Sequence, residues 1–221
     1  LATDLSPHAD RALDRAVQLA VGQGVGLDVL HVVARELMSG RDHEAALAAG
    51  AMALRDDVAD AGLPAALAVT TQARGGDAGP VIVQAAREGG SAMVVMAAPH
   101  ADMLVRIFRS SVLHHVVRHA PCPVRVVRRR ARQAYRRIVV AVDLSLPSRQ
   151  ALEMALRLFP AATMAQVDMT LVHADFTRAP AAAVREQRMR LDDMLSASLA
   201  RLAAEGLPPP GNIATVMEGG E

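Results

Sequence analysis

Ala-Thr-Asp-Leu-Ser at residues 2–6 recurs as Ala-Val-Asp-Leu-Ser at residues 141–145, and Ala12-Leu13 recurs as Ala151-Leu152 with the same offset of 139 positions. Two further stretches, Gly-Leu-Pro at 62–64 and Gly-Gly-Asp at 75–77, recur as Gly-Leu-Pro at 206–208 and Gly-Gly-Glu at 219–221, both at an offset of 144. Because the elements keep their order and the offset drifts by only five positions, the pattern indicates an internal duplication.

The duplication divides the chain into three parts. Residues 1–128 form a first domain with a short first strand, residues 129–136 an arginine-rich linker, and residues 137–221 the first half of a second domain. Because a half-sheet would expose an apolar edge, we expect further residues downstream. We also expect native residues upstream of Leu1.

Short apolar runs alternate with longer helical patterns in the first copy. Val29–Val33, Ala66–Thr70, Met93–Met96 and Val124–Val127 have no polar alternation, which is typical of strands covered by helices on both faces. The strand–helix order predicts an α/β fold, a doubly wound, five-stranded parallel sheet with helices on both faces. The second copy is expected to repeat it incompletely.

Capping residues and glycines mark the expected helices. Ser6-Pro7 predicts a start in which Ser6 caps the helix and Pro7 takes its first position. This helix should stop in the glycines at 22, 24 and 26, and the next three are expected at about 42–61, 79–88 and 111–119.

Composition excludes several classes of protein. The chain has a net charge of +1 and 21% charged residues, so it has no overall attraction to nucleic acid or membranes. No apolar run reaches the roughly 20 residues of a membrane span. A single cysteine, Cys122, rules out an intrachain disulfide and fits a reducing compartment, so we expect a cytoplasmic protein.

In an open parallel sheet, ligands bind beyond the carboxyl ends of the strands, where the strand order reverses. Three segments should meet there: Thr3-Asp4 after the first strand, Val32-Val33 after the second, and the loop from Ala97 to Ser110 before the last helix of the first copy. A loop that ends at a helix N-terminus can hold phosphate through free backbone N–H groups.

The residues of this loop resemble a known family. Met96-Ala97-(2)-His100-(9)-Ser110-Ser111-Val112, followed by Cys122-Pro123-Val124, is similar to the signature of the universal stress protein family, tandem-domain type, whose fold is adenine nucleotide alpha hydrolase-like. The resemblance implies a nucleotide pocket, with ATP as its ligand. The positions implied for this pocket are Thr3, Asp4, Val32, Met96, Ala97, His100, Ser110, Ser111 and Val112.

The loop departs from the family pattern at its glycines. Nucleotide-binding members carry Gly-x2-Gly-x9-Gly-(Ser/Thr), whereas this chain has Ala97, His100 and Ser110 at the three glycine positions and retains only Ser111. Glycine permits positive φ and a close approach of the backbone to phosphate. The nucleotide loop of the first domain is therefore expected to be degenerate.

Several other residues admit two interpretations. Asp4 and Asp143 either bond a nucleoside or cap the loop that follows them. The backbone N–H groups of Ser111 and Val112 either hold an anion, or Ser110 or Ser111 simply caps the helix. Arg106 and Arg109 in the loop either bind phosphate or are solvated.

Two clusters are interpreted as structural. His114, His115, His119 and Cys122 have chelating spacing at 115 and 119 but lack a nearby acid, so no metal site is expected. We expect the thiol of Cys122 to be buried. The six arginines of 128–137 come with a single aromatic residue, so a solvated linker is expected rather than a nucleic-acid site.

No catalytic constellation is present: the sequence contains neither a Gly-x-Ser-x-Gly elbow nor a Gly-x4-Gly-Lys-(Ser/Thr) phosphate loop. Our first hypothesis is a non-catalytic stress-response protein that dimerises or binds a protein partner. The resemblance implies association through the last strand, Pro123 to Arg128. The alternative is a working adenine-nucleotide binder, through the second copy or through Asp4 and Ser111, and a third hypothesis is a hydrolase on the same fold.

Overall fold

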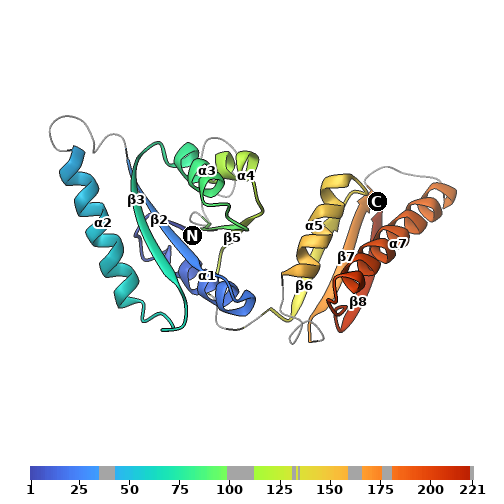
Figure 1. Ribbon diagram of the computed structural model, residues 1–221. Helices are drawn as coiled ribbons and strands as arrows, with labels where there is room; N and C mark the ends of the chain where they lie inside the picture. Colours follow the sequence, from blue (N-terminus) through green and yellow to red (C-terminus); the bar gives the residue numbers. More distant parts are fainter. Residues whose placement is uncertain are drawn as a thin grey trace. The chain divides into compact units, whose positions relative to one another are not determined.

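A computed structural model describes residues 1–34, 43–98, 112–130, 133, 135–158, 166–175 and 181–219. Its internal contacts divide the chain into two compact units, Leu1–Arg132 and Gln133–Glu221. Each unit is a layered arrangement of strands and helices (Figure 1).

The first unit alternates strands and helices along the chain. Its elements are β1 (Ala2–Thr3), α1 (Asp10–Gln23), β2 (Leu27–Ala34), α2 (His43–Asp60), β3 (Val69–Gly76), α3 (Ala78–Glu88), β4 (Val94–Ala97), α4 (Val112–His119) and β5 (Val124–Val127).

The five strands form one parallel sheet in the order β3-β2-β1-β4-β5. The chain adds strands in one direction up to β3 and then returns to the other side of β1, so the order reverses between β1 and β4. This is the doubly wound α/β fold expected from the sequence, and it places the carboxyl ends of β1 and β4 side by side.

Helices cover both faces of this sheet (Figure 1). On one face, Ala12, Leu13 and Ala16 of α1 and Leu54 of α2 pack with Val29 and other strand residues. On the other, Ile82 and Val83 of α3 and Leu113 and Val116 of α4 pack on Leu30, Val94 and Met96. The strands are therefore apolar on both sides, as their sequences indicated.

Two elements differ from the sequence expectation. Helix α1 begins at Asp10, and its N-cap residue is Ala9 without a side-chain cap. The Ser6 hydroxyl lies in the preceding turn and donates to Asp4. Strand β3 lies at 69–76 rather than at 66–70. It is an edge strand with alternating exposure, and its polar Gln72 and Arg74 hid it from a search for buried apolar runs.

The second unit has a smaller sheet. Its elements are β6 (Arg137–Val142), α5 (Leu146–Arg157), β7 (Asp168–Asp175), α7 (Ala181–Ala204) and β8 (Asn212–Gly219), and its three parallel strands are ordered β6-β7-β8. This arrangement fits an incomplete second copy of the same fold. Here Ser145 does cap the helix, accepting a hydrogen bond from Ser148 N at 3.3 Å.

One core holds the second unit together. Leu152 and Leu156 of α5 and Leu191, Met194 and Leu202 of α7 pack on the same side of the sheet. The other side carries Val139, which is 69% exposed. In the first unit α3 and α4 cover the corresponding side, whereas no helix covers it within the ranges described for the second unit.

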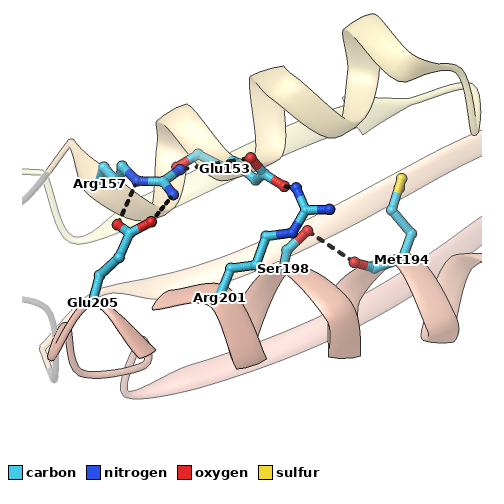
Figure 2. Close-up of polar contacts among 6 residues, drawn as sticks. All are labelled: Glu153, Arg157, Met194, Ser198, Arg201 and Glu205. Carbon is cyan, nitrogen blue, oxygen red and sulfur yellow. Dashed lines mark hydrogen bonds and ion pairs between the residues drawn. The ribbon is translucent and has the colours of Figure 1, made fainter. Parts of the chain in front are cut away.

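An ion network joins α5 to α7 across their exposed side (Figure 2). The Arg157 guanidinium makes a bidentate contact with Glu205, at 2.9 and 2.6 Å. Glu153 accepts from Arg201 at 2.8 Å and lies 3.7 Å from Arg157. Beneath it, the buried Ser198 hydroxyl donates to Met194 O within α7. Opposite charges thus alternate along the seam between the two helices.

Candidate functional site

A tight turn follows β1 at the carboxyl edge of the first sheet. Asp4 Oδ1 accepts hydrogen bonds from the backbone N of Ser6 at 3.0 Å and from its hydroxyl at 2.6 Å. Between them Leu5 has φ +58°, a conformation that leucine seldom adopts. Partial burial opposes ionisation of Asp4, but the hydrogen bonds from Ser6 outweigh it and lower the pKa of this carboxyl. Asp4 thus has the geometry of a residue that closes its own turn.

The second unit repeats this turn after β6. Asp143 Oδ1 accepts from Ser145 N at 3.0 Å, and Leu144 has φ +63°. Hydrogen bonds from the side chain and backbone of Ser145, and then from Ser148, lower the pKa of Asp143 to about 2. Both units therefore present an ionised carboxylate at the end of the first strand.

A histidine stands beside each turn, and our sequence reasoning did not treat it as a site residue. His31 lies opposite Thr3 in the register of β2 with β1, and its Nδ1 is 3.1 Å from Thr3 O. His173 lies opposite Val142 in the second sheet, with Nδ1 2.9 Å from Val142 O. The two histidines are 142 positions apart, between the offsets of 139 and 144, so the repeat itself could have revealed them.

Arg11 in the first turn of α1 is a second residue that sequence reasoning missed. Its guanidinium donates to Ala98 O at 2.6 Å and to Arg128 O at 2.9 Å. Ala98 follows β4 and Arg128 follows β5, so the side chain bridges the ends of these two strands. One of the two arginines of an amphipathic helix gave no signal of this role.

The other residues of the expected pocket are only partly placed. Met96 is buried in the core beside Ala2, and Val32 packs on the same core. Ala97 ends β4, and Val112 begins α4 with 40% exposure. Thr3 accepts from Leu5 N at 3.1 Å. His100, Ser110 and Ser111, together with Arg106 and Arg109, lie outside the described residues.

The histidine and cysteine cluster forms no metal site that can be recognised. His115 and His119 stack with ring centroids 4.3 Å apart. Within the described ranges, no three His, Cys, Asp or Glu side chains are grouped to hold a metal ion. Cys122 is half-buried rather than fully buried, and desolvation raises the pKa of its thiol. A protonated thiol is a poor nucleophile.

The start of the arginine-rich segment is exposed and also contacts α1. Arg130 Nε lies 2.6 Å from Asp14 Oδ2 of α1, in the same unit. Together with the bond from Arg11 to Arg128, this contact ties the start of the segment to α1. None of the helices described is long and apolar enough to cross a membrane.

The sequence profile of the universal stress protein family matches residues 1–128 and 134–220. This chain is similar to a universal stress protein of Archaeoglobus fulgidus DSM 4304, with 20% identity and a TM-score of 0.68. The match covers 100% of this chain and 76% of the other protein. A second similar structure, a universal stress protein from Pseudomonas aeruginosa UCBPP-PA14, has 21% identity and a TM-score of 0.54. The match covers 95% of this chain and 69% of that protein.

This chain is also similar to a universal stress protein in complex with cAMP, with 21% identity and a TM-score of 0.43. The match covers 58% of this chain and 93% of the other protein. No curated protein matches the sequence significantly. The two profile matches cover nearly the entire chain and coincide with the duplicated pattern of strands, turns and helices. The chain belongs to the universal stress protein family and carries two segments of that family in tandem.

Proposed function

We propose that this chain is a non-catalytic stress-response protein of the cytoplasm that works by pairing with a second copy or a protein partner. Its first repeat binds ATP weakly or not at all. The observation that carries the proposal is the state of the polar groups at the carboxyl ends of β1, β4 and β5. The Asp4 carboxylate there accepts two bonds from Ser6, and the Arg11 guanidinium is bonded to Ala98 O and Arg128 O. These contacts occupy Asp4 Oδ1 and the Arg11 guanidinium, so a nucleotide would have to displace them or bond only to Asp4 Oδ2.

The loop sequence supports weak nucleotide binding as well. Ala97 ends β4 where nucleotide-binding relatives carry glycine, and His100 and Ser110 replace the other two glycines. A Cβ at these positions restricts φ and keeps the backbone amides from wrapping a phosphate. The loop could still hold a smaller anion at the start of α4, but it would lack the close contacts needed for a triphosphate.

The edge strand β5 supports the pairing role. It is last in the order β3-β2-β1-β4-β5, so no strand described here pairs with its outer side. Pro123 O accepts from Val94 N, and Val127 O accepts from Ala98 N. Because successive residues of a strand direct their backbone groups to opposite edges, the N–H and C=O groups of Val124 and Val126 point away from β4. An open strand edge of this kind is a template for pairing with another strand.

The nucleotide part of the proposal is tested by calorimetry with ATP and Mg²⁺, and with cAMP as a second probe. We expect no binding heat at nucleotide concentrations up to about 1 mM, where the binding free energy would be about −4 kcal/mol. Restoring the glycines in Ala97→Gly/His100→Gly/Ser110→Gly should create binding. Micromolar affinity that persists in Asp143→Asn would refute this part.

The pairing part is tested by light scattering on a sizing column. Val126→Pro removes one outward N–H without touching the bonds to β4, and Val126→Ala matches its loss of side-chain volume. We expect the unaltered chain and Val126→Ala to associate and Val126→Pro to be monomeric. Equal masses for all three would exclude β5 as the edge through which copies of this chain pair.

A second candidate function is adenine-nucleotide binding by the second repeat. It is favoured by the Asp143 turn, which repeats the geometry of Asp4 and carries an ionised carboxylate at the edge where parallel sheets bind ligands. If the unaltered chain binds nucleotide, Asp143→Asn distinguishes the two repeats: loss of binding assigns the second, and loss only in Asp4→Asn assigns the first.

A further inference from the structure

The two histidines beside the Asp–Leu–Ser turns occupy the same place in two independent copies. In each, the ring stands on the strand next to the first strand of the unit and contacts the carbonyl of the residue just before the aspartate. The sheet registers Thr3–His31 and Val142–His173 are also the same. The arrangement is therefore a repeated feature of the fold and not an accident of one sequence.

Only one tautomer of each ring fits this contact. A carbonyl oxygen can only accept, so Nδ1 must carry the hydrogen and donate it. The carbonyl it reaches is the last of the strand, and the next residues enter a turn in which leucine has positive φ. Such a conformation costs of order 1 kcal/mol or more and persists only where surrounding contacts impose it.

Each turn is thus held from two sides. After the leucine, the aspartate accepts from the serine backbone at 3.0 Å in both copies. Before it, the imidazole fixes the carbonyl from which the turn departs. The leucine side chains, Leu5 and Leu144, pack against the cores of their units, so a turn that relaxed would also lose apolar contact.

The surroundings of the two rings differ. His173 is 6% exposed, and its Nε2 has no hydrogen-bond partner within the described ranges. His31 is half-buried under Gly50 of α2, where a Cβ would lie 3.3 Å from its Cδ2. What the two rings share is the bond from Nδ1.

We infer that His31 and His173 are positioning residues. Through Nδ1–H they anchor the end of the first strand of each repeat, and so hold the following aspartate in the turn at the crevice. This inference deepens the proposed function, on which it rests for the use of the crevice, but its geometry requires no ligand.

The test measures the carboxyl of Asp143 directly by NMR titration of the full chain. In His173→Leu the turn loses its anchor, and the pKa of Asp143 should rise from about 2 toward its ordinary value of 3.8. In His173→Asn the side-chain amide places a donor near the position of Nδ1, so the low pKa should be restored. In His173→Gln the amide lies near Nε2 instead, and the pKa should resemble that of His173→Leu.

A matched control separates positioning from loss of packing. Met169 lies on the same strand and the same side and is 1% exposed, so Met169→Ala removes buried volume without touching the turn. It should leave the pKa of Asp143 at about 2. An unchanged pKa in His173→Leu, or failure of His173→Asn to restore it, would overturn the inference.

If His173→Leu does not fold, the half-exposed His31 gives the same test in the first repeat. The pKa of Asp4 lies below its ordinary value, mainly through the bonds from Ser6 and to a lesser extent through the charge of His31. It should rise in His31→Leu, and His31→Asn should restore the part that depends on the turn. The titrations involve neither nucleotide nor self-association. Failure of the proposed function in calorimetry or light scattering would therefore leave their result unaffected.

Discussion

The helix pairs that cover the strands in the two repeats, α1 with α2 and α5 with α7, carry different charges at corresponding positions. An offset of 139 relates Asp14 to Glu153, and an offset of 144 relates Asp57 to Arg201. In the second repeat Glu153 and Arg201 form an ion pair at 2.8 Å (Figure 2). In the first repeat both positions are acidic, and desolvation, followed by the charges of Asp10 and Asp60, raises the pKa of Asp57.

The first repeat obtains its cation from elsewhere in the chain. Arg130, in the segment after β5, pairs with Asp14 at 2.6 Å. The fold therefore tolerates a change of charge on these helices, because exposed ion pairs contribute little to stability. What it retains is the apolar core and the turn after the first strand, where a change costs much more.

The largest loss of stability is expected from a core substitution in helix α5 of the second repeat. Leu152→Ala opens a cavity at a residue that is 0% exposed and should lower the free energy of unfolding by about 2–5 kcal/mol. Tyr135, the sole tyrosine in a chain without tryptophan, packs against this core and reports unfolding by fluorescence. Leu13→Ala should cost a similar amount in the first repeat, by circular dichroism.

Leu146→Ala is the control on the same helix, because its side chain is 65% exposed. Its effect should stay within about 0.5 kcal/mol. Equal losses for the two α5 variants would contradict the assignment of the core.

A smaller loss of stability is expected from a substitution in α2. Gly50 of α2 corresponds to Met194 of α7, so the two long helices differ in side-chain size at this position. A Cβ on Gly50 would lie 2.7 Å from Val33 Cγ2, and a β-branched valine cannot easily move aside. Overpacking of about 1–3 kcal/mol should outweigh the roughly 1 kcal/mol that alanine gains over glycine in a helix. Gly50→Ala should therefore lower the midpoint of thermal unfolding, and a raised midpoint would disprove the close contact.

Charge can be transplanted from the second repeat to the first. Asp57→Arg removes a repelled carboxylate and places a cation at the position of Arg201, so it should stabilise the protein by about 0.5–1 kcal/mol. Asp57→Asn removes only the repulsion and should give a smaller gain. Urea unfolding at low salt measures both, and a destabilising Asp57→Arg would show that the two surfaces are not interchangeable.

The smallest effect is a difference in pH dependence between two carboxyls. Because the pKa of Asp143 is lowered to about 2 in the folded protein, its stabilising contribution is present above its ordinary value of 3.8 and is lost as the pH falls toward 2. The pKa of Asp57 is raised above 3.8 in the folded protein. Its contribution to stability is therefore present below pH 3.8 and is lost as the pH rises through the raised pKa.

Urea unfolding across acidic pH should separate these opposite slopes. Asp143→Asn should remove the loss of stability as the pH falls toward 2. Asp57→Asn should remove the loss of stability as the pH rises above 3.8. Identical profiles for the two variants would mean that neither carboxyl has the partners described here.

Much of the fold could be predicted from local patterns. Strand β5 lies at Val124–Val127 as expected, and α2, α3 and α4 begin and end within about two residues of expectation, because glycines and apolar periodicity act on neighbouring residues. The start of α1 and the position of β3 were missed. For α1 the Ser6 hydroxyl bonds the carboxylate of Asp4, two residues earlier. For β3 the place at the edge of the sheet decided, because it lets Gln72 and Arg74 belong to a strand.

The candidate site was less accessible to prediction. Asp4 and Asp143 were identified from the repeat, but Arg11, His31 and His173 were not singled out, since their partners are backbone carbonyls on other strands. A carbonyl carries no sequence signal. Only the strand register places Thr3 O beside His31, and Ala98 O within reach of a side chain 87 residues earlier.

By itself, the amino-acid sequence determined that this protein is a tandem α/β repeat of the universal stress protein family, because duplication, apolar runs and turn residues are local and additive. Only the tertiary structure decided that Arg11 bonds Ala98 O and Arg128 O, and that Asp14 of α1 pairs with Arg130. Those outcomes depend on distances between residues far apart in the chain, and such distances are set when the sheet assembles.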